Sequence, residues 1–600
     1  MLVAAVIAAL SWLLPRRVVD ALAFVTAAAV AVMCAVLMSA TSTGRVVEWL
    51  GGWRPHQGLA IGISFTVDQI GAGAALLVSI RMCAVLAFSP AYFQEEFEHR
   101  HSILLLVFLA AMTGFALTGD LFDMFVFFEL MSVTAYALTG SRIREPGPLQ
   151  GAINFGLINS LGSFALLVGI ALVYGRTGAL NLAQIGHAFA GHAADGLVVV
   201  AFTLIVAGFL VKAGVVPFHF WLADAYAVVP IPVGVLFAAV FGELGLYAVA
   251  RVYWASFDGA LGAAQPGLRS VLLGFGALTA VVGCLMCFLQ QHVKRLLAFS
   301  TVSHIGLFLV GIALFTPNAL GGTAVYVAGH AMAKGALFLL VGVIVYRLGS
   351  VDEEELRGRG RGLRVTAVLF AVGGVVLAEL PPFATFAGKA MIEDDGVRMG
   401  FWWMPLLFAA TSAVVGASIL RVAGRVFLGW GPREPDRFGA DVAGEVEVDD
   451  EVEHPPHRRT PVLLLIPVAA LLAGSLALGL APGLSAKAAG AGAAFEDRQG
   501  YQAAVLQGRD TPPPTVRPEP TSASAVAYGL ASGVTAVGLA ALALFRRRVV
   551  PAGLRRRAAS MFEPAVIRFR ALQSGHVGDY AAWFAFGAAA LGGLFALAVK

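Results

Sequence analysis

The sequence has little charge. Asp, Glu, Lys and Arg together make up 13% of its 600 residues, whereas 58% are hydrophobic. Typical soluble domains contain about 25% charged residues, so the composition excludes a soluble globular protein. In place of charge, the chain has many apolar runs of about 18 residues or more, each long enough to cross a bilayer. We therefore predict an all-α polytopic membrane protein embedded in the lipid bilayer.

The chain also lacks the motifs that hold a redox cofactor, a nucleotide or a metal. Its four cysteines, Cys34, Cys83, Cys284 and Cys287, lie inside apolar runs, and the last two have no polar neighbours. Small apolar packing is therefore favoured over a metal or redox pair. The sequence contains no phosphate-binding glycine loop, no iron–sulfur cysteine pattern and no nucleophile motif. We expect no cofactor, no metal, no catalytic residue and no nucleic-acid partner, so any redox chemistry would belong to another subunit.

The apolar runs predict about sixteen transmembrane helices. Their spans are 2–14, 18–40, 67–90, 102–119, 121–140, 150–174, 196–216, 231–252, 268–290, 296–316, 320–346, 365–388, 401–430, 461–481, 524–545 and 578–598. The first run is short, but another apolar run follows at once, so we interpret it as a spanning helix. With the loops assigned alternately, most of the 41 Lys and Arg residues fall on one side. Because basic loops stay in the cytoplasm, we predict an inner-membrane protein with both termini outside.

Two polar insertions suggest the domain boundaries. Residues 431–460 contain an acidic stretch, and residues 485–523 are rich in Ala, Gly and Pro; both are typical of solvated loops. We predict three N-terminal helices (1–100), a helical core (101–430), an acidic cytoplasmic loop (431–460) and a three-helix C-terminal extension (461–600). In the extension, the arginine-rich segment 546–570 is either an amphipathic element on the inner leaflet or an ordinary basic loop.

Five ionisable side chains each stand alone inside a different apolar run. They are Glu129, Lys212, Glu243, Lys334 and Lys389. Each costs about 2.5–3.5 kcal/mol at bilayer depth on insertion scales, so these side chains must face one another or water. The pattern indicates an ion or proton path.

Prolines interrupt two of the same apolar runs. Pro217 follows Lys212 by five residues, and the pair Pro381 and Pro382 precedes Lys389. Proline breaks a helix, and a membrane tolerates the break only where the freed backbone groups face protein or water. Broken helices in corresponding positions of two halves predict an inverted repeat with an ion site at each break.

We interpret Glu129 and Lys212 as a buried pair that acts as a switch, because a carboxylate and an ammonium in low dielectric favour each other's charge. The alternative is that a neighbouring hydroxyl such as Thr134 satisfies Glu129. Further along, His330 and Lys334 are four residues apart and share a helix face. With His304 they form a second predicted group, which is either a proton relay or a set of satisfied core histidines.

Five segments carry a family resemblance. They are TGDLFDMFVFFELMSVTAYAL, LVKAGVVPFHFWLADAYA, VKRLLAFSTVSHIGLFLVG, GHAMAKGALFLLVG and LPPFATFAGKAM. Over roughly 65–430 they resemble the antiporter-like membrane subunits shared by NADH:quinone oxidoreductase (complex I), Mrp-type multisubunit Na+/H+ antiporters and membrane-bound hydrogenases. The first segment is most similar to the D subunit of the Mrp-type antiporters.

The resemblance implies a fourteen-helix core of two inverted five-helix repeats, with broken seventh and twelfth helices. It implies that Glu129 is the fifth-helix glutamate and Lys212 the seventh-helix lysine. Lys334 would be a central lysine near His304 and His330, and Lys389 would be the twelfth-helix lysine of the exit.

Three features depart from the family pattern. Glu243 stands where the family usually has a lysine or histidine, and Glu379 is an unusual acid beside the second proline break. The chain is also longer than typical D subunits of the Mrp-type antiporters. The roles of both acids and of the extension are left open.

From these features we expect a proton-translocating subunit of a larger membrane complex, with partner membrane subunits and with protons, and in one variant sodium, as the transported ions. The path would run from Lys212 through Glu243, His304, His330 and Lys334 to Lys389. The alternatives are a stand-alone transporter of a small solute and a non-conducting structural subunit. Which assembly contains the chain is left open.

Overall fold

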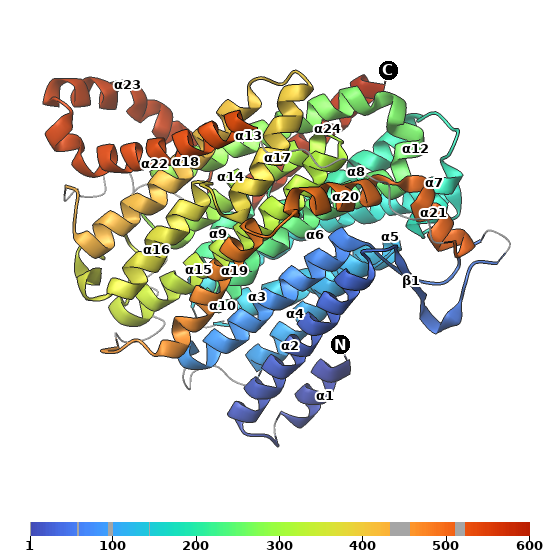
Figure 1. Cartoon of the computed structure of the whole chain (residues 1–600), viewed down its shortest axis with the longest axis horizontal. Coiled ribbons are helices and arrows are strands. Elements are labelled where there is room, and N and C mark those ends of the chain that lie inside the picture. Colours follow the sequence, from blue (N-terminus) through green and yellow to red (C-terminus); the bar gives the residue numbers. More distant parts are fainter. Residues whose placement is uncertain are drawn as a thin grey trace.

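The structure is a computed structural model that describes residues 2–11, 13–56, 59–93, 100–142, 145–432, 457–509 and 522–599. Figure 1 shows a bundle of helices with one small β-hairpin at its edge. The hairpin pairs β1 (Val46–Trp49) and β2 (Ser64–Val67) in antiparallel fashion, with Val46 opposite Val67. The acidic stretch predicted from Glu445 to Glu453 lies outside the described residues.

The helices fall into three sets along the chain. The first comprises α1 (Leu2–Leu10), α2 (Arg16–Ala40), α3 (Gln69–Phe93), α4 (Arg100–Leu117), α5 (Leu121–Thr139), α6 (Pro146–Thr177), α7 (Leu182–Ala188) and α8 (Gly196–Ala213). The second comprises α9 (Phe220–Val228), α10 (Ile231–Leu236), α11 (Gly242–Val252), α12 (Asp258–Leu261), α13 (Gln265–Leu289), α14 (Val293–Ala313), α15 (Pro317–Leu348) and α16 (Arg364–Leu377). The third comprises α17 (Ala384–Arg398), α18 (Met404–Ala423), α19 (Ile466–Gly479), α20 (Leu484–Glu496), α21 (Arg498–Gln507), α22 (Ala523–Val549), α23 (Ala552–Ala571) and α24 (Val577–Val599).

Thirteen of the described helical segments are long and apolar enough to span a membrane. The chain is thus an all-helical polytopic membrane protein, as predicted. All of α14 is buried, and so is 83% of the apolar window of α15. These two helices therefore form the centre of the bundle, away from lipid.

Three of the sixteen predicted spans do not appear as separate spans. The run 2–14 gives only the nine-residue α1, which at 1.5 Å per residue is far too short for a hydrocarbon core of roughly 30 Å. The run 365–388 is divided, because α16 ends at Leu377 ahead of the two prolines. The runs 231–252 and 268–290 are counted once among the thirteen, because Gly242–Leu289 is a continuous helical segment of 48 residues. That segment contains α11 and α13 as distinct helices.

The C-terminal extension packs more closely than the sequence suggested. The prediction of a solvated loop over 485–523 is wrong for its first part, which forms α20 and α21. In Figure 1, α19 and α20 cross the front of the bundle, where both contact α15. The approach is tight, since a Cβ on Gly321 of α15 would lie 2.1 Å from the Ala488 carbonyl oxygen. Most of the arginine-rich segment 546–570 forms α23, which projects from one end of the bundle.

Candidate functional site

The first broken helix runs from α8 to α9. Helix α8 ends at Ala213, Pro217 lies in the unwound segment, and α9 begins at Phe220. Side chains satisfy the freed backbone groups: Trp221 Nε1 donates to the Val211 carbonyl at 3.0 Å, and the Val216 N–H donates to Thr279 Oγ1 at 3.1 Å. The break is therefore a stable feature inside the protein, as irregular backbone at membrane depth must be.

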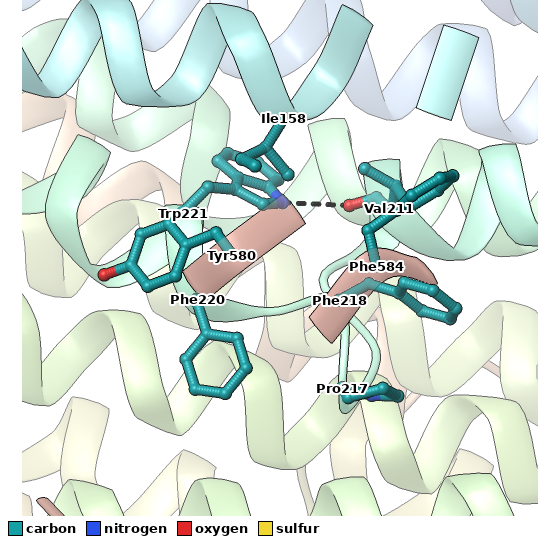
Figure 2. A pocket seen from close by; sticks show the side chains of 8 residues that line it. All are labelled: Ile158, Val211, Pro217, Phe218, Phe220, Trp221, Tyr580 and Phe584. Carbon is teal, nitrogen blue, oxygen red and sulfur yellow. Dashed lines mark hydrogen bonds between the residues drawn. The ribbon is translucent and has the colours of Figure 1, made fainter. Parts of the chain in front are cut away.

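Helix α24 covers this break. Tyr580 and Phe584 of α24 lie beside Pro217 and Trp221 in a narrow pocket (Figure 2), whose interior has no room for a water molecule. The Tyr580 hydroxyl donates to Asp224 Oδ2 of α9 at 2.7 Å. The C-terminal helix thus packs over the first break and is tied to the half-helix that follows it.

Lys212 lies in the last turn of α8 and is fully buried. Its ammonium donates to the Ser132 hydroxyl of α5 and lies 4.1 Å and 4.0 Å from the ring centroids of Phe128 and Phe241. Aromatic faces attract a cation. The surroundings of Lys212 are therefore a hydroxyl and two rings.

Glu129 is half-buried on α5, three residues before Ser132. It accepts a hydrogen bond from the Ser163 hydroxyl of α6. Glu129 and Lys212, both described, form no ion pair within 4 Å, and Thr134 donates to the Leu130 carbonyl. The structure thus does not bring the predicted pair into contact, since Glu129 bonds to Ser163 and Lys212 to Ser132, and Thr134 is not the partner of Glu129 either.

The two predicted histidines meet at the centre of the bundle. The rings of His304 on α14 and His330 on α15 stack with centroids 4.4 Å apart and an interplanar angle of 28°. His330 Nδ1 lies 3.4 Å from Glu243 Oε1 of α11. The structure therefore brings Glu243 and both histidines into one cluster, buried on all sides.

Lys334 joins this cluster through α14. Its ammonium donates to the Ser300 hydroxyl and, at 2.6 Å, to the Leu297 carbonyl. His304 Nδ1 lies 2.7 Å from the Ser300 carbonyl oxygen. Lys334 and His304 are thus held by the same residue of α14, one by its side chain and the other by its backbone.

The second broken helix runs from α16 to α17. Helix α16 ends at Leu377, Pro381 and Pro382 lie in the unwound segment, and α17 begins at Ala384. The Thr385 hydroxyl donates to the Val376 carbonyl at 2.9 Å. Helix α22 covers this break and donates from Ser532 to the Ala378 carbonyl at 3.2 Å.

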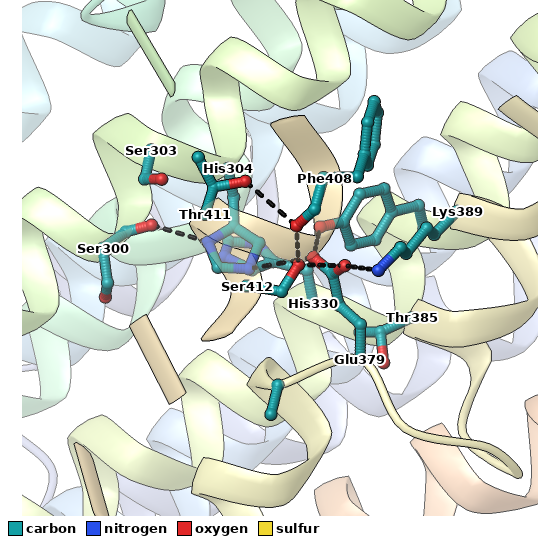
Figure 3. A network of polar contacts seen from close by, with 12 residues as sticks. Ser300, Ser303, His304, His330, Glu379, Thr385, Lys389, Phe408, Thr411 and Ser412 are labelled. Carbon is teal, nitrogen blue, oxygen red and sulfur yellow. Dashed lines mark hydrogen bonds and ion pairs between the residues drawn. The ribbon is translucent and has the colours of Figure 1, made fainter. Parts of the chain in front are cut away.

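Glu379 lies inside the second break and is fully buried. Its carboxylate accepts from the Tyr326 and Ser412 hydroxyls, lies 3.0 Å from Lys389 Nζ and lies 3.7 Å from His304 Nε2. Figure 3 shows the histidine pair on one side of Glu379 and Lys389 on the other. Glu379 therefore connects the central cluster to the lysine of the second break.

The backbone of Glu379 is in the left-handed region, with φ 59°. This conformation favours glycine and is uncommon for other residues, at a cost on the order of 1–3 kcal/mol. The strained backbone therefore occurs at Glu379, the residue whose carboxylate makes the most polar contacts at this break.

Three buried ionisable residues, Glu379, Glu393 and Arg81, are not part of the path predicted from the sequence. Glu379 stands out there only as an unusual acid, and the other two are not singled out. Glu393 Oε1 lies 3.7 Å from Lys389 Nζ, four residues away on α17. The guanidinium of Arg81 is fully buried on α3, forms no hydrogen bond to a described residue, and lies next to Gly335, the neighbour of Lys334. The sequence could have identified Arg81, because it is the one charged residue (Lys, Arg, Asp or Glu) in the apolar helix α3.

The cluster consists of groups that donate and accept protons. Among the described residues, no group of three or more His, Cys, Asp or Glu side chains is arranged to hold a metal ion. Contacts of 4.4 Å or less between carboxylates, imidazoles and an ammonium suit proton transfer, given small side-chain movements or bridging water.

Comparisons with known proteins give a consistent result. Residues 118–415 match the family described as NADH:quinone oxidoreductase/Mrp antiporter, transmembrane. The chain is 29% identical over 438 residues to the D subunit of the Na+/H+ antiporter of Bacillus subtilis (strain 168), covering 72% of this chain and 82% of that protein. It is 28% identical over 470 residues to the N subunit of the NADH-quinone oxidoreductase of Desulforudis audaxviator (strain MP104C), covering 76% and 90%.

Solved structures agree. A chain in the Mrp complex of Dietzia sp. DQ12-45-1b superposes with a TM-score of 0.73 and 28% identity, covering 84% of this chain and 98% of that one. A chain in respiratory complex I of Thermus thermophilus gives 0.61 and 25%, covering 81% and 98%. The resemblance predicted from the five motifs is confirmed: the chain belongs to the NADH:quinone oxidoreductase/Mrp antiporter transmembrane family.

Proposed function

We propose that this chain translocates protons as one subunit of a multisubunit membrane assembly of the Mrp antiporter or complex I type. Relatives are named as the D subunit of an antiporter and the N subunit of a quinone oxidoreductase, and the similar solved chains come from an Mrp complex and a respiratory complex I. The family itself implies proton translocation. Exchange of sodium for protons, as in the antiporters, stays part of the proposal.

The observation that supports this function is a continuous series of buried proton carriers. In order they are Glu243, His330, His304, Glu379 and Lys389, with successive separations of 3.4, 4.4, 3.7 and 3.0 Å. The 4.4 Å value joins ring centroids, and the other values join individual nitrogen and oxygen atoms. The series crosses several helices of the buried centre, which is where a path protected from lipid has to run.

The proposed path begins at the first break. Glu129 and Lys212 receive a proton, and Lys212 passes it toward Glu243 past the ring of Phe241, two residues earlier on the same helical run. The proton then moves through the histidines, with Lys334 adjacent to them, and reaches Lys389 at the second break. In this proposal the breaks at Pro217 and at Pro381 and Pro382 are the seventh and twelfth helices of two inverted five-helix repeats.

The proposal also includes the arrangement of the chain in the membrane. Residues 1–100 would form the N-terminal helices, 101–430 the translocating core, 431–460 a cytoplasmic loop and 461–600 an extension. The basic loops would face the cytoplasm and the C-terminus would lie outside the inner membrane. Because α1 is too short to span, the N-terminus would lie with Arg16 and Arg17 on the cytoplasmic side, and not outside as the sixteen spans implied.

Substitution at the entry tests this function. Lys212→Ala and Glu129→Ala are expected to abolish coupled proton transport by the intact complex in inverted vesicles, measured with a pH-sensitive dye, while the complex still assembles. Arg176→Ala is the matched control, because Arg176 forms an exposed ion pair with Asp195 away from the path. Normal pumping by both entry variants would reject proton transport through this chain and leave a structural role.

A further inference from the structure

The second break holds two carboxylates for one lysine. Glu379 and Glu393 are 0% and 2% exposed, and Lys389 lies between them, 3.0 Å from Glu379 Oε2 and 3.7 Å from Glu393 Oε1. If both carboxylates were ionised and Lys389 protonated, the three side chains would carry a net charge of minus one. A buried charge without compensation is costly. With the neighbouring His304 neutral, the group is therefore compensated only when it binds a second proton in addition to the one on the Lys389 ammonium.

The contacts of Glu379 and Glu393 indicate which of the two carboxylates binds the second proton. Glu379 accepts from the hydroxyls of Tyr326 and Ser412 and forms an ion pair with Lys389 at 3.0 Å. The two hydroxyl donors and the adjacent ammonium stabilise its ionised form. Neither oxygen of Glu393 has a hydrogen-bond partner among the described residues. The additional proton belongs on Glu393, because nothing but Lys389, at a longer distance, stabilises its anion.

The surroundings of Glu393 also place it nearer to solvent than Lys389. It lies one turn further along α17, toward the helix end at Arg398, whose charged side chain is 46% exposed. On the same stretch, Asp394 accepts from the backbone N–H and hydroxyl of Ser522, and Asp395 accepts from Thr316 and Asn318. Those two acids bind the starts of other helices, whereas the carboxyl group of Glu393 is left available.

We propose that Glu393 is the last proton carrier of the path, so that the exit is a carboxylic acid rather than a lysine. The inference rests on the proposed function of the chain. Glu393 releases its proton to water, which breaks its O–H bond and leaves a carboxylate. A proton then passes from the Lys389 ammonium to Glu393, breaking an N–H bond and forming an O–H bond. Lys389, now an amine, is reprotonated from the His304 side through Glu379.

The distance between the two groups is compatible with this step. The 3.7 Å separation exceeds a hydrogen bond, but residues four apart share one helix face, so a rotamer change or one bridging water closes the gap. Between transfers Glu379 is ionised and keeps the ammonium in place, which gives the two carboxylates different roles.

Proton transport by the intact complex in vesicles tests the proposal. Glu393→Gln is expected to lower the transport rate by about a hundredfold, the usual contribution of a proton-transferring side chain, and Glu393→Asp is expected to keep part of it. Asp394→Asn is the matched control on the same turn and should transport at the wild-type rate. The amount of assembled complex, measured for every variant, separates loss of transport from loss of folding.

A second measurement does not depend on transport. Infrared difference spectroscopy of the wild-type complex should show the C=O stretch of a buried protonated carboxylic acid, and Glu393→Gln should remove that band while Asp394→Asn keeps it. Wild-type transport by Glu393→Gln, or an unchanged band, would overturn the proposal. If Glu393→Gln transports normally and Lys212→Ala does not, the exit assignment fails while the proposed function stands; if both transport normally, the function fails too.

Discussion

The two broken helices are interrupted in the same way, but the lysine at each break has different electrostatic surroundings. Each has proline in the unwound segment, a side chain that satisfies a freed carbonyl, and a C-terminal helix laid over it. At the first break Lys212 meets a hydroxyl and two aromatic rings, whereas at the second Lys389 lies between two carboxylates. Among the described residues no carboxylate contacts the first lysine, whereas two carboxyl groups flank the second. A repeated backbone architecture therefore does not imply repeated chemistry.

The largest expected effect separates the two lysines by stability. Lys389→Met leaves the Glu379 carboxylate buried without its cation, and breaking such a buried pair costs about 3–5 kcal/mol. Lys212→Met leaves only a hydroxyl without its donor and removes an uncompensated charge, so it should cost about 1 kcal/mol or less. Thermal unfolding of the two purified variants in detergent measures the difference.

A triple variant sharpens the same contrast. Lys389→Met combined with Glu379→Gln and Glu393→Gln removes both acids and with them the uncompensated charge, so it should recover most of the stability that Lys389→Met loses. Equal losses for Lys212→Met and Lys389→Met would show that the two breaks are electrostatically alike.

A smaller effect is expected where the C-terminal helices cover the breaks. A Cβ on Gly587 of α24 would lie 2.6 Å from Pro217 Cγ, and one on Gly533 of α22 would lie 2.6 Å from Leu380 Cδ1. Gly587→Val and Gly533→Val should each destabilise the protein by about 1–3 kcal/mol through overpacking.

Glycines with open surroundings provide the controls for both helices. At Gly593 of α24 and Gly538 of α22, an added Cβ would meet no heavy atom within 4 Å, so valine there should be tolerated. Unfolding midpoints of the four variants give the comparison, and equal midpoints within each helix would mean that neither helix is tightly seated on its break.

The smallest effect concerns Glu496, the last residue of α20. Burial raises the pKa of Glu496 well above its ordinary value of 4.5, and the charges of Asp395 and Asp258 raise it further. Glu496 ends α20, which is not among the candidate spans. A raised carboxyl pKa means that the folded state holds the proton more tightly, so stability falls as pH rises above about 4.5.

Glu496→Gln removes this dependence. The variant should match the wild type at about pH 4 and be more stable at about pH 8, by about 0.5–1 kcal/mol, with Glu48→Gln at an exposed position of β1 as the control. Unfolding curves at the two pH values provide the measurement. A stability difference that does not change with pH would mean that Glu496 is not held protonated in the folded state.

Much of the fold was readable from the sequence because the bilayer imposes a simple rule. Long apolar runs located most of the helices, and prolines in an apolar run located both breaks, because proline cannot continue a helix. The short α1 was misjudged because hydropathy does not measure where a helix starts and ends. The helices α20 and α21 were missed because Ala and Gly in their sequence are as typical of a loop as of a helix packed tightly on another.

The site was harder to predict from the sequence, because its contacts join helices that are far apart along the chain. The isolated charges identified Lys212, Lys334 and Lys389, but spacing along the chain could not show that Lys212 turns to Ser132 or that Lys389 lies between two acids. The role of Glu379 depends on a left-handed backbone and on hydroxyls from α15 and α18. Only the three-dimensional arrangement combines those features.

The position of α24 also bears on how neighbouring subunits can be arranged. Tyr580, Phe584 and Gly587 already occupy the surface at Pro217 and Phe218. A membrane protein approaching from that side meets the outer face of α24, so the chain supplies from its own C-terminal region the wall that lipid or a neighbour would otherwise form. Loss of the last helix would therefore change what borders the first break, even though every residue of the proton series would remain in place.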